Sequence, residues 1–149
     1  MSSTTAAAGV FTTDAALVVQ TWDAWLARAT GVDEEMARGR RLAELFPEVE
    51  RRGLLAQLRR VVETGEIVVL APALHEYLVP CAPRAPAVHF VRMQQHVTVA
   101  PLHAGGSVAG VVVTIQDVTA RRDRERELAQ QLKSDDETVR LRAARALAE

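Results

Sequence analysis

Residues 10–22 form two short apolar runs separated by polar residues. Val10–Thr12 is β-prone, Asp14-Ala15 is typical of a turn, and Leu17–Trp22 is rich in β-branched and aromatic residues. Because the two runs are joined by so short a turn, the pattern predicts two strands that pair as a hairpin.

Helical spacing follows the hairpin. Asp23 can cap a helix that Gly31 ends, and shorter helical turns are predicted at 33–36 and 42–46. The longest internal helix comes next and ends at Gly65. Its predicted apolar face consists of Leu54, Leu55, Leu58, Val61 and Val62.

Strand-like patterns return after this helix. Strands are predicted at 67–70 and 74–79, and three prolines within 80–86 indicate a loop. A long strand is predicted over His89–Leu102, followed by a glycine turn and a final strand over 108–116. The long strand would place Val91, Met93, Val97 and Val99 on its apolar face and Arg92, Gln94, His96 and Thr98 on its polar face. The element order predicts an α+β fold with an antiparallel sheet and short helices on one face.

The last apolar strand ends in Asp117-Val-Thr119 and passes directly into a charged stretch. Arginines alternate with acidic residues from Arg121, which favours a solvated helix over 120–133. Leu128 and Leu132 give this helix only a thin apolar seam. It is interpreted as a charged linker or signalling helix with some tendency to dimerise.

Composition narrows the function classes. The chain has 149 residues, 48% of them hydrophobic and 25% charged, with a net charge of −1. These values predict one soluble domain with no nucleic-acid or membrane partner. Residues 1–8 lack a secretory pattern and are interpreted as a disordered lead-in, and the single Cys81 excludes an internal disulfide. A cytoplasmic location is therefore expected.

The chain resembles the PAS family over residues 9–119. The resemblance rests on an ordered set of segments rather than on any one of them. These are the opening hairpin, Trp22–Gly31, Leu42–Pro47, Val62–Glu66, Val99–Leu102 and Asp117–Thr119. The resemblance implies a five-stranded sheet in the order 2-1-5-4-3, a small apolar pocket between sheet and helices, and signal output through the C-terminal helix, with Asp117 and Thr119 at the exit.

The pocket implied by the resemblance would hold a small apolar ligand. Its predicted lining is Leu58, Val62, Leu78, Val91, Met93, Gln95, Val97, Val111, Val113 and Ile115, with Trp22 and Trp25 helping to close it. Gln95 is the polar member of this set. A buried amide needs hydrogen-bond partners, so Gln95 either serves the structure or holds the polar end of a ligand.

The sequence does not identify a cofactor. Flavin photochemistry is disfavoured because the Asn-Cys-Arg-Phe type motif of light-sensing PAS relatives is missing and Cys81 lies in a proline-rich loop. His75 and His89 are the candidate haem ligands, although an isolated histidine is more often structural. No metal-ligand spacing, phosphate loop or nucleophile motif occurs, so neither a metal site nor an enzyme is expected.

Residues 134–149 resemble the start of a HEAT-like helical repeat; an ordinary amphipathic helix is the alternative. The whole pattern favours a sensory module that binds a ligand or a partner and acts through its C-terminal helix. It would act as a homodimer or on a downstream signalling protein. The alternatives are a ligand-free dimerisation or docking scaffold, a haem-binding gas or redox sensor, and, last, a small isomerase-like enzyme.

Overall fold

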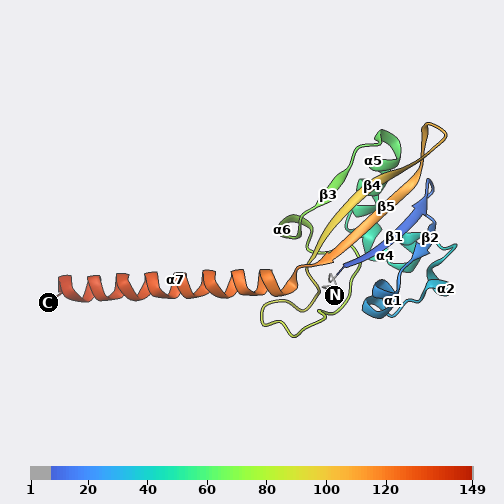
Figure 1. Cartoon of the computed structure of the whole chain (residues 1–149). Coiled ribbons are helices and arrows are strands. Elements are labelled where there is room, and N and C mark those ends of the chain that lie inside the picture. The colour runs from blue at the N-terminus through green and yellow to red at the C-terminus, as the bar shows by residue number, and fades with distance from the viewer. Residues whose placement is uncertain (1–7, 149) are drawn as a thin grey trace, which may run out of the picture.

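A five-stranded antiparallel sheet with helices packed against it forms the domain, and a long helix projects from its edge (Figure 1). The computed structural model describes residues 8–148. Its strands are β1 (Ala8–Asp14), β2 (Val19–Trp22), β3 (Val68–Leu70), β4 (Gln95–Ala104) and β5 (Ser107–Asp117). Its helices are α1 (Ala24–Thr30), α2 (Glu34–Ala37), α3 (Leu42–Leu45), α4 (Pro47–Arg51), α5 (Leu54–Thr64), α6 (Pro72–His75) and α7 (Thr119–Ala148).

The strand order is β2-β1-β5-β4-β3, which confirms the α+β fold class and the predicted order. The predicted opening hairpin is present as β1 and β2. Asp23 caps α1 as expected, because its carboxylate accepts a hydrogen bond from the amide of Leu26, and Gly31 ends that helix in a left-handed conformation. The predicted lead-in at 1–8 lies outside the described residues except for Ala8, which begins β1.

The core lies between one face of the sheet and helices α1 to α5. The apolar face of α5 is buried on β4 and β5, as its spacing predicts, with Leu58 and Val61 fully enclosed. Three aromatic rings pack together beside them: the ring centroid of Trp22 lies 5.2 Å from that of Phe11 and 6.0 Å from that of Phe46. Such rings bury large areas, so this cluster is a main source of the domain's stability.

Two strand predictions between β3 and β5 are wrong. Residues 74–79 do not form a strand: Pro72 begins the short helix α6, and Glu76 then turns the chain with a positive φ of 63°. The long strand predicted from His89 begins only at Gln95. The preceding residues form a loop, so Val91 is 88% exposed rather than inward, and His89 lies in that loop rather than in a strand.

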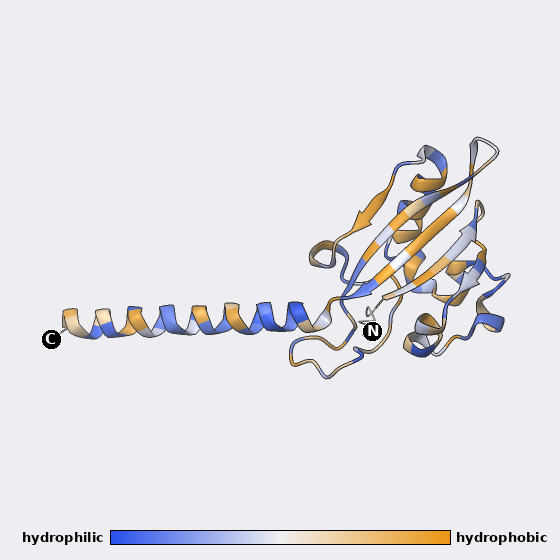
Figure 2. Ribbon diagram, in the orientation of Figure 1, coloured by the Kyte–Doolittle hydropathy of each residue, from blue (hydrophilic) through white to orange (hydrophobic). Residues whose placement is uncertain are grey.

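The C-terminal 30 residues of the described chain form one helix, α7, without a break between Lys133 and Ser134. Its first turns are strongly hydrophilic (Figure 2), and every residue from Arg124 to Ala148 is exposed. The HEAT-like repeat predicted at 134–149 stays a prediction. Within the described part of the chain, α7 is the longest helix, and even it is too polar to cross a bilayer.

Candidate functional site: the junction between the sheet and α7

Asp117 and Thr119 join the last strand to the first turn of α7. One carboxylate oxygen of Asp117 accepts hydrogen bonds from the Thr119 amide, at 3.0 Å, and from the Thr119 hydroxyl, at 2.6 Å. Thr119 is only 3% exposed, whereas Asp117 is half-buried, so these bonds are partly shielded from water. Asp117 therefore plays the part of a helix cap at the point where the sheet ends.

Gln94, the residue just before the neighbouring strand β4, holds the same junction. Its backbone amide donates to the Thr119 hydroxyl at 2.8 Å, and its backbone carbonyl accepts from the Val118 amide at 2.9 Å. Its side-chain oxygen accepts from the Arg122 guanidinium at 3.1 Å. The strand pattern predicts Gln94 on the polar face, but the residue is buried at 2% exposure, because α7 begins directly over it. The sequence analysis did not identify this residue as functional. Its partner Arg122 is 28 residues away, so the neighbouring residues of Gln94 do not indicate the contact.

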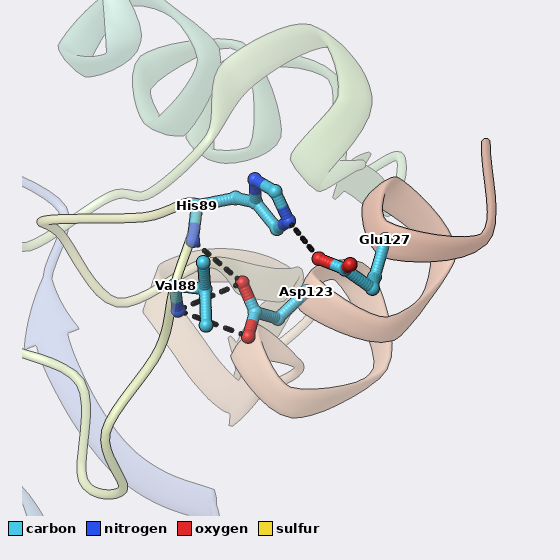
Figure 3. Close-up of polar contacts among 4 residues, drawn as sticks. All are labelled: Val88, His89, Asp123 and Glu127. Carbon is cyan, nitrogen blue, oxygen red and sulfur yellow. Dashed lines mark hydrogen bonds and ion pairs between the residues drawn. The ribbon is translucent and has the colours of Figure 1, made fainter. Parts of the chain in front are cut away.

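A loop segment far away in the sequence also contacts α7 (Figure 3). The Asp123 carboxylate accepts from the amides of Val88, at 3.1 Å, and of His89, at 2.7 Å. These backbone hydrogen bonds, that of Val88 first, lower the pKa of Asp123 below its usual value. One turn further along the helix, the Glu127 carboxylate lies 2.8 Å from Nε2 of His89.

Phe90 continues this contact on an adjacent row of the helix. The guanidinium groups of Arg126 and Arg122 lie 4.6 Å and 5.4 Å from the centroid of its ring. Both distances are within the range of cation–π attraction. We call the segment Val88–Phe90 the strap, because it lies across the first two turns of α7 and is held there by three successive residues.

Gln95 fixes the chain beneath the strap. Its side-chain oxygen accepts from the backbone amides of Leu78, at 2.9 Å, and Val79, at 3.2 Å, and its side-chain nitrogen donates to the Val79 carbonyl at 2.8 Å. The same nitrogen lies 3.5 Å from the sulfur of Cys81 and 3.6 Å from that of Met93. The sequence allowed Gln95 either a structural role or the role of holding the polar end of a ligand. The contacts of this amide are those expected for the structural role.

The residues predicted to line a pocket differ in burial, from fully buried to exposed. Seven of them are fully buried, and all of these except Met93 belong to the hydrophobic core that includes the aromatic rings: Leu58, Leu78, Met93, Val97, Val111, Val113 and Ile115. Gln95 is buried with them, whereas Val62 lies at the rim of the core and lines a surface hollow of about 170 Å³. Val91 is in solvent. The ligand pocket thus stays a prediction, with Val91 removed from its lining.

Hollows of comparable size lie at the domain surface. One of about 330 Å³ has Leu17, Leu42 and Leu55 among its lining residues and Arg41 and Arg59 beside them. Two others, of about 230 Å³ and 260 Å³, lie near the base of α7, and the larger of them adjoins the strap. The first of these two is lined by Asp117 and Thr119 of the junction, among others, and the second by His89, Phe90 and Arg126.

The haem-ligand candidates do not converge on the core. The His89 ring faces α7 and contacts Glu127 (Figure 3), and His75 is the last residue of the short helix α6. Cys81 is buried at 6% exposure, and this burial raises the pKa of its thiol to about 11. Among residues 8–148, no three histidine, cysteine or acidic side chains gather as a metal site.

Comparisons with known proteins agree with this geometry. The PAS domain of histidine kinase ThkA is similar at a TM-score of 0.54 and 20% identity, over 74% of this chain and 98% of that one. A sensory box sensor histidine kinase from Vibrio cholerae gives 0.56 and 18%, over 75% and 82%. An RNA-binding light-oxygen-voltage receptor gives 0.61 and 17%, over 90% of this chain but 35% of that one.

Likeness at such identities shows the fold alone, so the expectation that no nucleic acid takes part stays a prediction. No curated protein is significantly similar in sequence. A sequence model of the PAS fold, however, matches residues 3–123, which is most of the chain. Together with the strand order and the junction, this match shows that the chain belongs to the PAS family.

Proposed function

We propose that this chain is a sensory module that binds a small ligand or a partner protein and passes the resulting change to α7. The observation that carries the proposal is the junction of Gln94, Asp117 and Thr119, in which Gln94 and Thr119 are buried. Through it, the end of β5 and the residue just before β4 are bonded to the base of a helix that is exposed from Arg124 onward. A shift of these strands would therefore move the helix, without any catalytic step.

Ligand control of such a device requires unequal affinity for two states of the junction. Freshly purified protein examined by native mass spectrometry should retain a small molecule if the ligand arm of the proposal is right. A protein at apo mass that nevertheless forms a stable dimer would speak for the scaffold alternative. The exposed Leu128, Leu132 and Val139 of α7 favour that alternative, because they offer apolar surface to another helix.

Transmission through the junction is tested by Thr119→Val. The change keeps the shape of the side chain but removes the hydroxyl that accepts from Gln94 and donates to Asp117. We expect amide exchange at Gln94 and in the first turn of α7 to accelerate about tenfold or more, because a buried amide loses its partner. Thr119→Ser retains the hydroxyl and is the control. Equal exchange in both variants would contradict the proposed route.

A further inference from the structure

The strap differs from the rest of the domain in how it is held. Its three residues contact two neighbouring rows of α7: Val88 and His89 meet Asp123 and Glu127, and Phe90 meets the Arg122–Arg126 row. Residues four apart lie on one helix face, so three successive loop residues are enough to cover two turns.

These contacts are polar and close to water. The side chain of Val88 is exposed, and this residue contributes only its backbone amide; Glu127 is half-exposed, with 51% of its side chain accessible. A hollow of about 260 Å³, lined by His89, Phe90 and Arg126 among others, lies beside the strap, so the strap does not fill the space along the helix. A segment with few buried apolar contacts and exposed hydrogen bonds opens locally without unfolding its domain.

The ends of the loop are held much more firmly. On its N-terminal side, the backbone of Leu78 and Val79 is bonded by the Gln95 side chain. On its C-terminal side, the Met93 amide donates to the Cys81 carbonyl at 2.8 Å. Between these anchors, Arg84 stacks over the ring of Trp25 at 5.6 Å. The loop is therefore fixed where it leaves and re-enters the core, while the strap between can detach from the helix.

We propose that the strap is a releasable clasp that sets the direction in which α7 leaves the domain. The junction holds α7 only at its base. A single point of attachment fixes the position of the helix base better than it fixes the direction of the helix axis. A second hold at Asp123 and Glu127, one and two turns further out, fixes direction as well. This inference rests on the proposed function, in which α7 carries the output, and names the strap as the element whose release changes it.

The test compares Asp123→Ala with Asp136→Ala. Asp136 is also an acidic residue of α7, but it pairs with Arg140 on the same helix, away from the domain. Spin labels at Gln20→Cys and Gln131→Cys, both exposed positions, report the direction of α7 as a distance distribution. Labelled protein is diluted with unlabelled protein, so that only distances within one chain are measured.

We expect Asp123→Ala to accelerate amide exchange at Val88 and His89 at least about tenfold and to broaden or shift the distance distribution, whereas Asp136→Ala changes neither. The clasp is overturned if exchange at these two amides is unchanged, or if it rises while the distribution stays that of the wild type. Thr119→Val is run in parallel. If it leaves the first turn of α7 protected, the proposed function fails, whatever the result at Asp123.

Discussion

At the scale of single residues, Gln95 shows how one side chain takes the place of a missing strand. The loop at Leu78 and Val79 has no ladder partner at this point, yet both amides and one carbonyl are bonded, because the Gln95 amide offers an acceptor and a donor as a backbone would. Buried backbone groups must be paired, and this residue pairs three of them.

Gln95→Leu should therefore lower the free energy of unfolding by about 3 kcal/mol, since each unpaired buried group costs about 1–3 kcal/mol. Chemical denaturation measures the loss. Gln116→Leu is the matched control, because Gln116 is an exposed glutamine of β5, and its replacement should change stability by less than about 0.5 kcal/mol. Equal losses in the two variants would contradict a special role for Gln95.

Cys81 should be chemically inert in the folded protein. Burial raises the pKa of its thiol from 9.0 to about 11, so the reactive thiolate is roughly 100-fold less populated at neutral pH. Reaction with a coloured disulfide reagent at pH 8 should be slow until denaturant is added. A thiol placed at the exposed Gln131 should react within the dead time of the same assay, and comparable rates would refute the burial of Cys81.

At the scale of elements, β5 is the strand on which the domain depends. It pairs with the whole length of β1 on one side and with β4 on the other. Its last residue, Asp117, bonds the first turn of α7. Gly110 lies where β5 faces the end of β1. A Cβ atom there would overlap the backbone carbonyl of Thr13, so the close approach of the two strands requires glycine.

Gly110→Ala should lower the free energy of unfolding by about 2 kcal/mol or more, because β1 and β5 must separate locally. The neighbouring Ala109 is exposed and supplies the control Ala109→Ser, for which little change is expected. Thermal unfolding followed by circular dichroism compares the two. A stable Gly110→Ala variant would mean that the strands are not so close.

At the scale of the whole molecule, two separate holds on α7 join the sheet to the output helix. Gln94 and Thr119 of the junction are buried, whereas the strap is partly exposed and is held by charged groups of α7. The buried contacts of the junction resist changes of solvent, whereas the more exposed contacts of the strap respond to them. Acidity is the simplest such change, since the strap depends on the Asp123 carboxylate.

Because the pKa of Asp123 is lowered on folding, its contribution to holding the strap is complete above its ordinary value of 3.8 and is lost as the pH falls through the lower value of the folded protein. The amide resonances of Val88 and His89 should therefore shift together in that acidic range, while those of the core strands do not. Asp123→Asn should abolish this step. Using Glu127→Gln as the background removes the other carboxylate that contacts the strap.

Much of the fold could be predicted because its signals are local. The hairpin, the cap at Asp23, the apolar face of α5 and the exit at Asp117-Val-Thr119 each follow from the spacing or chemistry of adjacent residues. Such patterns report which face of an element is buried, and burial of that face is the main driving force for folding. The ordered set of these segments was sufficient to indicate the family.

What the sequence could not determine lies between residues 71 and 94. There the prolines and apolar residues suit either strand or loop, and the choice is made by Gln95, Asp123 and Glu127, which lie outside the segment. Outside residues 71–94, the sequence by itself determined the main elements and the exit of α7, because periodicity and caps are local. Only the tertiary structure decided that Gln94 is buried and that His89 faces the helix, because those positions depend on contacts between residues 25 to 38 apart in the chain.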